Sequence, residues 1–461
     1  MIGVIGIILS LALLMYLAYR GITVLILAPI LALVAATFSG MPLMAMFTHV
    51  YMPNLANYLS MFFPVFLLGA VFGKVMEDTG SAKAIAHDIT TRLGKDRVIL
   101  AVVIACGILT YGGVSLFVVA FAIYPIAAHL FRESGIPKRL VAGTIALGAF
   151  TFSMTALPGT PQIQNAIPMP FFKTTAYAAP ILGMISAILM CGLGVWWLST
   201  RAKKAMAAGE GYGDHPKEVI KQFDDNADLP SLGVALSPII IVLILNFILS
   251  EYVFTANAAG YEYLKDKPFS TSLGAVRGIW SLVIALVVGV IFGVAMNWKR
   301  FTNVKESINS GVFGSMLPIL NTASETGYGN CIKTLAAFAI VQAAVLGISD
   351  NPLITAAIAT NVLAGITGSA SGGMSIALGA MGNIFYEQAI AKGINPEVLH
   401  RVVSIACGGL DTLPHNGAVI TLLGITQLTH RQSYADIGMV CCVIPVFVCA
   451  IAIVLGTLGV V

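Results

Sequence analysis

Long apolar segments with few charges recur along the whole chain, and they constrain its fold more than any other feature. Of the 461 residues, 58% are hydrophobic and only 10% are charged, whereas a soluble globular chain carries about 25% charged residues. Apolar runs of about 17–25 residues are typical of helices that cross a lipid bilayer. The pattern predicts an all-α polytopic membrane protein. The apolar segments lie at 2–19, 22–38, 54–76, 97–131, 139–157, 174–199, 232–254, 276–297, 310–324, 352–385, 398–430 and 437–460.

The charges and the cysteines argue against several other classes. The net charge is +4, and no basic stripe alternates with aromatic residues, so we expect no nucleic-acid partner. None of the seven cysteines forms a C-x-x-C pair, so we expect neither a metal site nor a disulfide framework, and no cofactor. We interpret the apolar N-terminus as a first transmembrane helix and not as a cleaved signal peptide.

Two of the apolar segments are too long for one span, and Gly and Ser interrupt each of them. Segment 97–131 contains "TYGGVS" at Thr110–Ser115, and segment 352–385 contains "TGSASGGMS" at Thr367–Ser375. Such a break predicts two half-helices that meet at a tip and return to the side from which they came. Non-helical backbone at membrane depth is tolerated only where it is buried in protein or lines a wet cavity.

The distribution of Lys and Arg favours one threading of the chain through the membrane. With both hairpins re-entrant and both termini outside, eighteen of the 25 basic residues lie inside and seven lie outside. Because inner loops are enriched in Lys and Arg, we expect ten full spans plus two re-entrant hairpins. His400 and Arg401 are then expected near the outer surface.

An internal repeat is indicated by four pairs of similar short sequences, which occur in the same order at offsets of 247 to 260 residues. The pairs are "DTGSAKAI" and "ETGYGNCI", "GGVSL" and "GGMSI", "GIP" and "GINP", and "LPGT" and "LPHN". They predict a first repeat at 1–200, a polar cytoplasmic linker at 201–230 and a second repeat at 231–461. Each repeat has five spans, an odd number, so the second is inverted. Inverted repeats are typical of secondary transporters.

Each hairpin is followed by a helix that a proline interrupts, at 156–165 and at 410–417. Proline removes a backbone donor, and nearby glycine allows the chain to turn. The break leaves a helix N-terminus free, and such a terminus attracts anions. The four interruptions carry no Lys or Arg, and we expect them to surround one site for a small anionic or polyhydroxylated solute. Their small polar side chains are Ser115, Thr160, Gln162, Ser369, Ser371, Ser375 and Asn416. The alternative is close helix packing through small residues.

Asp411 is the most informative single residue, because an ionised carboxylate at membrane depth must be paired or protonated. We expect it to carry a coupling proton, which His415 could share, and Glu325 is a second candidate. Alternatively, Asp411 caps the broken helix and Glu325 lies at the membrane interface. Coupling to Na⁺ is also possible, since backbone carbonyls and hydroxyl oxygens can bind this ion.

At four places the chain resembles the gluconate permease family of the ion transporter superfamily. These are "YLAYRGITVLILAPILALVAA", "YGGVSLFV", "ALPGTPQIQNAIP" and "GGLDTLPHNGAV". The resemblance implies import of small hydroxy-monocarboxylates with protons, an elevator-type transport domain and a scaffold domain that dimerises. It adds the tip and break residues Gly112, Gly113, Pro158, Gly159, Gly372 and His415 to the expected substrate site. The first break lacks the His found in sugar-acid members, which favours short hydroxyacids such as 3-hydroxybutyrate.

Three other functions fit the sequence less well. A channel is expected to show a continuous polar stripe, an enzyme a nucleophile with its base, and a primary pump a G-x-x-x-x-G-K-[ST] nucleotide loop, and the sequence contains none of these. The alternative within transporters is an ion-coupled antiporter or Na⁺-coupled carboxylate transporter of the same superfamily. We expect a multi-pass protein of a bacterial inner membrane.

Overall fold

The computed structural model describes residues 2–20, 22–94, 97–215, 229–414 and 416–461, and every regular element within these ranges is helical. The helices of the first half end at residue 207. They are α1 (Ile2–Tyr19), α2 (Val24–Phe38), α3 (Leu43–Met46), η1 (Phe47–Tyr51), α4 (Met52–Asp78), α5 (Ser81–Leu93), α6 (Val98–Tyr111), α7 (Leu116–Glu133), α8 (Arg139–Ala149), α9 (Phe152–Thr155), α10 (Ile163–Ala166), α11 (Pro168–Phe172) and α12 (Pro180–Ala207).

The second half begins after the polar linker, whose residues 216–228 lie outside the described part of the chain. The first residues of the predicted linker, 201–207, belong to α12. The helices of this half are α13 (Leu232–Phe247), η3 (Ile248–Val253), α14 (Phe254–Ala256), η4 (Ala258–Lys265), α15 (Leu273–Met296), η5 (Trp298–Arg300), α16 (Val304–Thr334), α17 (Phe338–Leu346), α18 (Pro352–Thr367), α19 (Ala370–Ala391), α20 (Pro396–Cys407), α21 (Gly417–Thr426), α22 (His430–Gly438), η6 (Met439–Val443) and α23 (Ile444–Thr457).

Helix length supports fewer full spans than the sequence predicted. Among the described residues, five helices are long and apolar enough to cross a bilayer, or six if α16 and α17, which meet at 98°, form one span. Other apolar helices are only 10–17 residues long. The expected ten full spans counted apolar segments, and several of these are divided by breaks, as 139–157 is divided into α8 and α9.

Two helix pairs form the hairpins expected from the sequence. Helices α6 and α7 pack against each other and join through residues 112–115, where Gly113 has φ +94°, a value that favours glycine. Helices α18 and α19 join through Gly368 and Ser369 alone. The second tip is therefore much shorter than the predicted Thr367–Ser375, and most of that stretch is the first turn and a half of α19.

The two arms of the second hairpin touch backbone to backbone. A Cβ atom added at Gly373 would lie 2.1 Å from the backbone nitrogen of Ala364 on the other arm. Small residues that allow helices to approach closely are common in membrane bundles. At this position, the close-packing alternative explains the glycine better than a broken backbone does.

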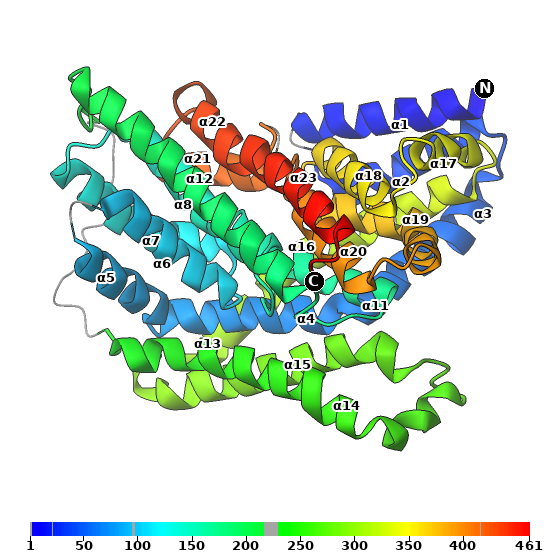
Figure 1. Cartoon of the computed structure of the whole chain (residues 1–461), viewed down its shortest axis with the longest axis horizontal. Coiled ribbons are helices and arrows are strands. Elements are labelled where there is room, and N and C mark those ends of the chain that lie inside the picture. Colours follow the sequence, from blue (N-terminus) through cyan, green and yellow to red (C-terminus); the bar gives the residue numbers. More distant parts are fainter. Residues whose placement is uncertain (1, 21, 95–96, 216–228, 415) are drawn as a thin grey trace.

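Both predicted helix breaks are present. Residues 156–162 separate α9 from α10, and residues 408–414 and 416 separate α20 from α21 within the described chain. After the first break, the helix resumes only as the short α10 and α11, because Pro168 begins a new turn. In Figure 1, the hairpin α6–α7 lies on the left and α18–α19 on the right of the molecule.

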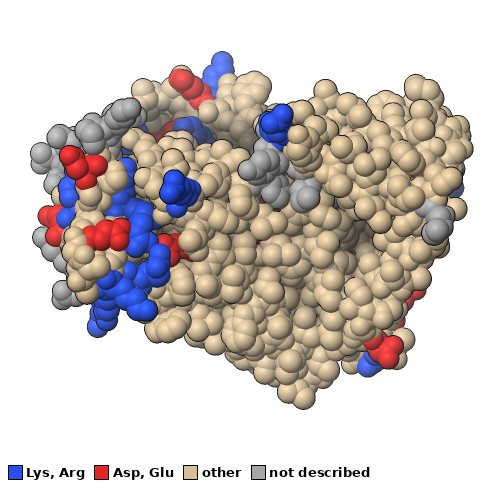
Figure 2. All heavy atoms as spheres, turned by 90° about the horizontal axis from the view of Figure 1, so that it is seen from above, with Lys and Arg blue, Asp and Glu red and all other residues tan. Residues whose placement is uncertain are grey.

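Basic side chains gather at one end of the molecule. Figure 2 shows most of the visible Lys and Arg at the left end, where α5 and α7 also lie in Figure 1, and the N-terminus lies at the opposite end. Buried Asp436 connects three helices at this end: from α22, it forms ion pairs with Arg139 on α8 at 3.2 Å and with Arg201 on α12 at 3.1 Å. The predicted cytoplasmic placement of this end is based on the same charges, because inner loops are enriched in Lys and Arg.

Candidate functional site

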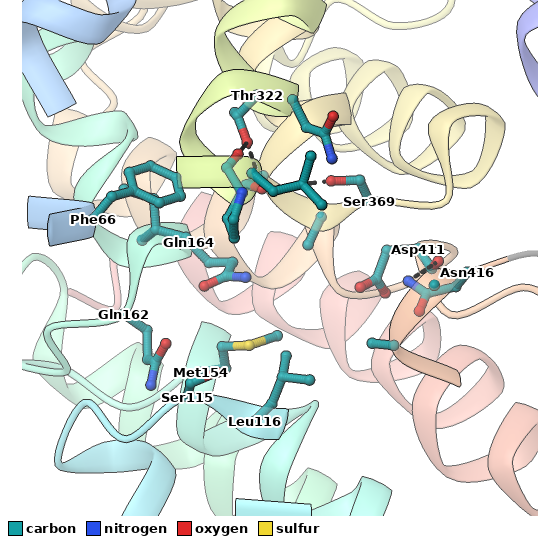
Figure 3. A pocket seen from close by; sticks show the side chains of 18 of the residues that line it. Phe66, Ser115, Leu116, Met154, Gln162, Gln164, Thr322, Ser369, Asp411 and Asn416 are labelled. Atoms are coloured by element: carbon teal, nitrogen blue, oxygen red, sulfur yellow. Dashed lines mark hydrogen bonds between the residues drawn. The ribbon is translucent and has the colours of Figure 1, made fainter. Parts of the chain in front are cut away.

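A cavity of about 630 Å³ lies where the two hairpin tips and the two breaks meet. Its walls come from α2, α4, α9 and α16, together with both tips and both breaks (Figure 3). This volume falls in the range of about 300–1,000 Å³ that is usual for small-molecule sites. The four interruptions of helical structure that the sequence singled out are thus brought to one place.

The cavity contains two carboxyl groups and no basic side chain among its described lining residues. Its only charged lining residues in the described chain are Asp411, from the second break, and Glu325, from α16. Both side chains are almost fully buried, and Asp411 Oδ1 and Glu325 Oε2 have no hydrogen-bond partner among the described residues. A buried carboxylate without a cation is costly when it is ionised, so both groups are candidates to bind a proton or a mobile cation.

Three helices begin at the wall of the cavity. These are α7, α19 and α21, which start just after Ser115, Ser369 and Asn416. The Ser369 hydroxyl accepts a hydrogen bond from Gly372 N at 3.0 Å, and Asn416 Oδ1 accepts one from Val419 N at 2.9 Å. Other N–H groups of each first turn have no partner within the helix and give it a partial positive charge. The cavity therefore offers an anion oriented dipoles instead of a basic side chain.

Each break is fastened to the neighbouring hairpin tip by a side-chain amide. In the first half, Gln162 Nε2 donates to the carbonyls of Thr110 at 2.8 Å and Val114 at 3.2 Å. In the second half, Asn416 Nδ2 donates to the carbonyls of Gly368 and Asp411, both at 2.9 Å. These bonds hold tip and break together on both sides of the cavity.

Eight of the predicted site residues line the cavity, and six others do not. Those that line it are Gly113, Ser115, Gln162, Glu325, Ser369, Ser371, Asp411 and Asn416. Those described residues that lie elsewhere are Gly112, Pro158, Gly159, Thr160, Gly372 and Ser375. His415 lies outside the described residues.

The residues of the first half that miss the cavity pack on its outer side. Gly112 lies against Ile239, whose side chain would be 2.6 Å from an added Cβ atom, and Gly159 lies against the Tyr177 ring in the same way. The Pro158 carbonyl accepts a hydrogen bond from Tyr111 Oη at 2.8 Å. Thr160 is fully buried, and its Oγ1 lies 3.4 Å from the Tyr111 carbonyl, to which it donates. These residues support the tip and do not face the solute space.

Gly372 and Ser375 lie on α19, on the side that packs against α4 and α16. A Cβ atom at Gly372 would be 1.8 Å from Glu325 Oε2, so the glycine makes room for the carboxylate. Ser375 is buried, and its hydroxyl is 3.5 Å from Tyr58 Oη. Both residues thus act through the packing of α19 against its neighbours.

The sequence analysis missed Gln164, which lines the cavity from α10. The sequence alone does not show which amides of "PQIQN" face inward, because their directions depend on how the helix resumes after the break. A polar amide within an otherwise apolar stretch is the signal that could have drawn attention to it.

The expected surface position of His400 and Arg401 is wrong. Both side chains are completely buried on α20, beneath the first break. The Arg401 guanidinium donates to the carbonyls of Ala178 at 2.7 Å, Ala176 at 3.3 Å and Thr155 at 3.5 Å, and to Asn165 Oδ1 at 3.0 Å. Carbonyls of unwound backbone, such as those of Ala176 and Ala178, are not used by helical hydrogen bonds and can accept from Arg401. The sequence does not show in which direction they point.

Candidate metal ligands do not cluster in the described chain, where no group of three or more His, Cys, Asp and Glu side chains could hold a metal ion. The site consists of carboxyl, hydroxyl and amide groups, oriented helix N-termini and an apolar wall from α4. Such a site can bind a small solute and exchange protons or monovalent cations with it.

A helical membrane chain with a central polar cavity that receives two hairpin tips belongs to the class of membrane transporters. The chain belongs to the GntP family: the model for "GntP family permease" matches residues 1–456. The family and its members transport solutes, so this chain is a multi-pass transport protein and not an enzyme.

The relatives agree with this assignment. An uncharacterized transporter, YxjC, of Bacillus subtilis (strain 168) is 46% identical over 443 residues, 94% of each chain. A high-affinity gluconate transporter of Escherichia coli (strain K12) is 26% identical over 401 residues, 83% of this chain and 82% of the relative.

Two solved transporter structures share the fold at low sequence identity. The YdaH transporter of Alcanivorax borkumensis superposes with a TM-score of 0.56 at 16% identity, over 88% of this chain and 87% of that one. MtrF of Neisseria gonorrhoeae gives 0.55 at 13% identity, over 91% and 84%.

Proposed function

We propose that the protein is a secondary active transporter that imports a small hydroxy-monocarboxylate together with H⁺. The observation that carries the proposal is the pair of buried carboxyl groups, Asp411 and Glu325, each with one oxygen that lacks a hydrogen-bond partner, in a cavity whose described lining has no basic residue. An anion cannot enter this space at low cost while both carboxylates are ionised. Proton binding removes the repulsion, and the helix N-termini then favour the bound anion.

Coupling follows from the same electrostatics. A proton on Asp411 makes substrate binding favourable, and the bound anion in turn favours the protonated carboxyl group, because linkage between two ligands is reciprocal. Loss of the proton on the cytoplasmic side expels the anion. Asp411 lies in the break itself, beside the α21 N-terminus, where a proton and an anion can influence each other directly.

The substrate class is supported by three observations. The relative from Escherichia coli is named a gluconate transporter, which is a transporter of a hydroxy-monocarboxylate. The cavity combines hydroxyl and amide groups with an apolar wall from α4, which suits a short hydroxyacid. The first break contains no His, so we favour a 3-hydroxybutyrate-like solute over gluconate itself.

Uptake into proteoliposomes tests the proposal. Purified protein is reconstituted into vesicles, and uptake of labelled 3-hydroxybutyrate and gluconate is measured under three conditions. These are an inward H⁺ gradient, with the outside more acidic, a collapsed H⁺ gradient, and an inward Na⁺ gradient. We expect uptake that follows the pH gradient. Asp411→Asn should abolish accumulation against a gradient while exchange of substrate across the membrane persists. If Asp411→Asn accumulates substrate as the wild type does, the coupling role of Asp411 is wrong.

Coupling to Na⁺ or exchange for a second anion is the alternative. Carboxylate, hydroxyl and backbone oxygens are suitable Na⁺ ligands, and the cavity contains all three. Uptake that follows the Na⁺ gradient would favour Na⁺ symport. Uptake that requires a carboxylate inside the vesicle would favour antiport.

We further propose two inverted repeats, 1–200 and 231–461, that move as an elevator within a homodimer in a bacterial inner membrane. The matching amide ties of Gln162 and Asn416, one in each half, support the repeat. For the elevator, Thr175 donates to Glu251 Oε1 at 2.8 Å, across the boundary between the loop 173–179 and η3. Joining cysteines at these two positions with a short thiol cross-linker should stop transport if this boundary slides. Light scattering of the detergent complex measures the number of copies.

A further inference from the structure

Three amide side chains lie close together in "PQIQN", and two of them form hydrogen bonds with the protein around them. Gln162 holds the first hairpin tip, as described above. Asn165 Nδ2 donates to the carbonyls of Thr160 and Ala176, both at 2.9 Å, and its Oδ1 accepts from Arg401 at 3.0 Å. Asn165 also meets His400 Nε2 at 3.2 Å, so every one of its bonding positions serves the fold.

Gln164 differs from both neighbours. Its side chain is 7% exposed, and its Oε1 atom has no hydrogen-bond partner among the described residues. The residue lines the cavity, and Figure 3 shows its amide group in the space enclosed by the labelled lining residues. A buried carbonyl oxygen without a donor is unfavourable unless a ligand or water supplies one.

The backbone at Gln164 is held in place by α20. Its backbone carbonyl accepts a hydrogen bond from Ser404 Oγ on α20 at 3.1 Å. The next residue, Asn165, is bound to His400 and Arg401 on the same helix. This turn of α10 is therefore anchored on its buried side, and the Gln164 side chain lines the cavity from it.

We infer that Gln164 determines specificity by accepting a hydrogen bond from the hydroxyl group of the substrate. The inference rests on the proposed function, since it concerns how that same site tells a hydroxyacid from a plain carboxylate. The bare Oε1 can only accept, so the ligand must donate, and the hydroxyl of a hydroxyacid is the donor that a simple fatty acid lacks. A site built for such a bond rejects the analogue that leaves its buried group unpaired.

The test compares three acids as competitors of labelled 3-hydroxybutyrate uptake in proteoliposomes: unlabelled 3-hydroxybutyrate, 3-fluorobutyrate and butyrate. Fluorine is close to a hydroxyl group in size but cannot donate a hydrogen bond. For the wild type, we expect the fluoro acid and butyrate to compete about tenfold more weakly than the hydroxyacid, the factor that one hydrogen bond to a buried acceptor commonly contributes. Equal competition by the fluoro acid would overturn the inference, and this arm needs no variant.

The variant arm uses Gln164→Met, which keeps the length of the side chain and removes its polar atoms. We expect the preference for the hydroxyacid over butyrate to fall from about tenfold to nearly none. Gln342→Met, the same change on α17 away from the cavity lining, is the matched control and should keep the preference. An unchanged preference in Gln164→Met overturns the inference and leaves the proposed function intact. Absence of carboxylate uptake by the wild type overturns both.

Discussion

Gly372→Ala is expected to displace the Glu325 carboxylate while leaving the fold intact. The added Cβ atom would lie 1.8 Å from Oε2 and 2.3 Å from Cδ, where ordinary contact begins at 3.4 Å. The carboxyl group must therefore retreat by roughly 1.6 Å, the difference between the contact limit and the first distance. It can do so, because it is the free end of a flexible side chain. Alanine is also a better helix former than glycine by about 1 kcal/mol, so thermal stability should not fall.

Transport should respond strongly to this displacement. A shift of about 1 Å in a positioned group can lower a rate about 100-fold, and we expect uptake of 3-hydroxybutyrate driven by a pH gradient to fall by about that factor. Initial rates in proteoliposomes and the unfolding temperature in detergent measure the two effects separately. Gly424→Ala on α21 is the control, since an added Cβ there meets nothing within 4 Å.

A second substitution identifies the cause. Glu325→Asp shortens the side chain by one carbon–carbon bond, about 1.5 Å, which is close to the retreat that Gly372→Ala requires. Each single variant should therefore be impaired, and the double variant should recover part of the rate. Wild-type uptake in Gly372→Ala would refute the importance of the carboxylate position. A double variant no better than the product of the two single losses would show that Gly372 and Glu325 act independently.

The remaining predictions concern stability at the two ends of the bundle. Arg401→Met should lower the free energy of unfolding by about 3 kcal/mol or more, because buried carbonyls such as that of Ala178 lose their donors. Arg401→Lys should recover little of this loss, since an ammonium group lacks the planar arrangement of donors in a guanidinium group. Thermal unfolding followed by tryptophan fluorescence checks both variants. At the basic end, the guanidinium of Arg139 lowers the pKa of Glu210 from its ordinary value of 4.5. This pair therefore stabilises the fold above that pH and loses its effect as the pH falls below it. Glu210→Gln should lower the unfolding temperature slightly at pH 7, and the difference from the wild type should shrink as the pH falls below 4.5. A difference that stays constant from pH 7 to pH 3 would contradict this explanation.

The hairpins and breaks could be predicted from the sequence because proline and glycine act locally. Pro158 and Pro414 each lie in an unwound stretch, and Gly113 has the positive φ that a tight tip requires. The extent of the second tip could not be predicted in this way. Gly372 and Gly373 remain helical, and their lack of a side chain allows contacts with Glu325 on α16 and with Ala364 on the other arm of the hairpin.

The candidate site could be predicted in part for a related reason. Asp411 and Glu325 stand out because ionisable groups are rare in apolar segments, and both line the cavity. The direction of an uncharged amide depends on how the broken helix turns, so Gln162 and Gln164 could not be told apart beforehand. The burial of Arg401 depends on carbonyls that only the folded loop 173–179 presents. Sequence patterns identify unusual residues, but the pairing of those residues with unwound backbone requires coordinates.

The contact between Gly373 and Ala364 has a mechanical consequence. Because the arms of the second hairpin meet at backbone distance, they cannot be pressed closer together, and spreading them would open a void that no side chain fills. The hairpin must then move as a rigid body, and its tip at Gly368 and Ser369 moves with both arms. Access to the cavity from that side can change only when the whole hairpin α18–α19 moves or when the helices that face it move away.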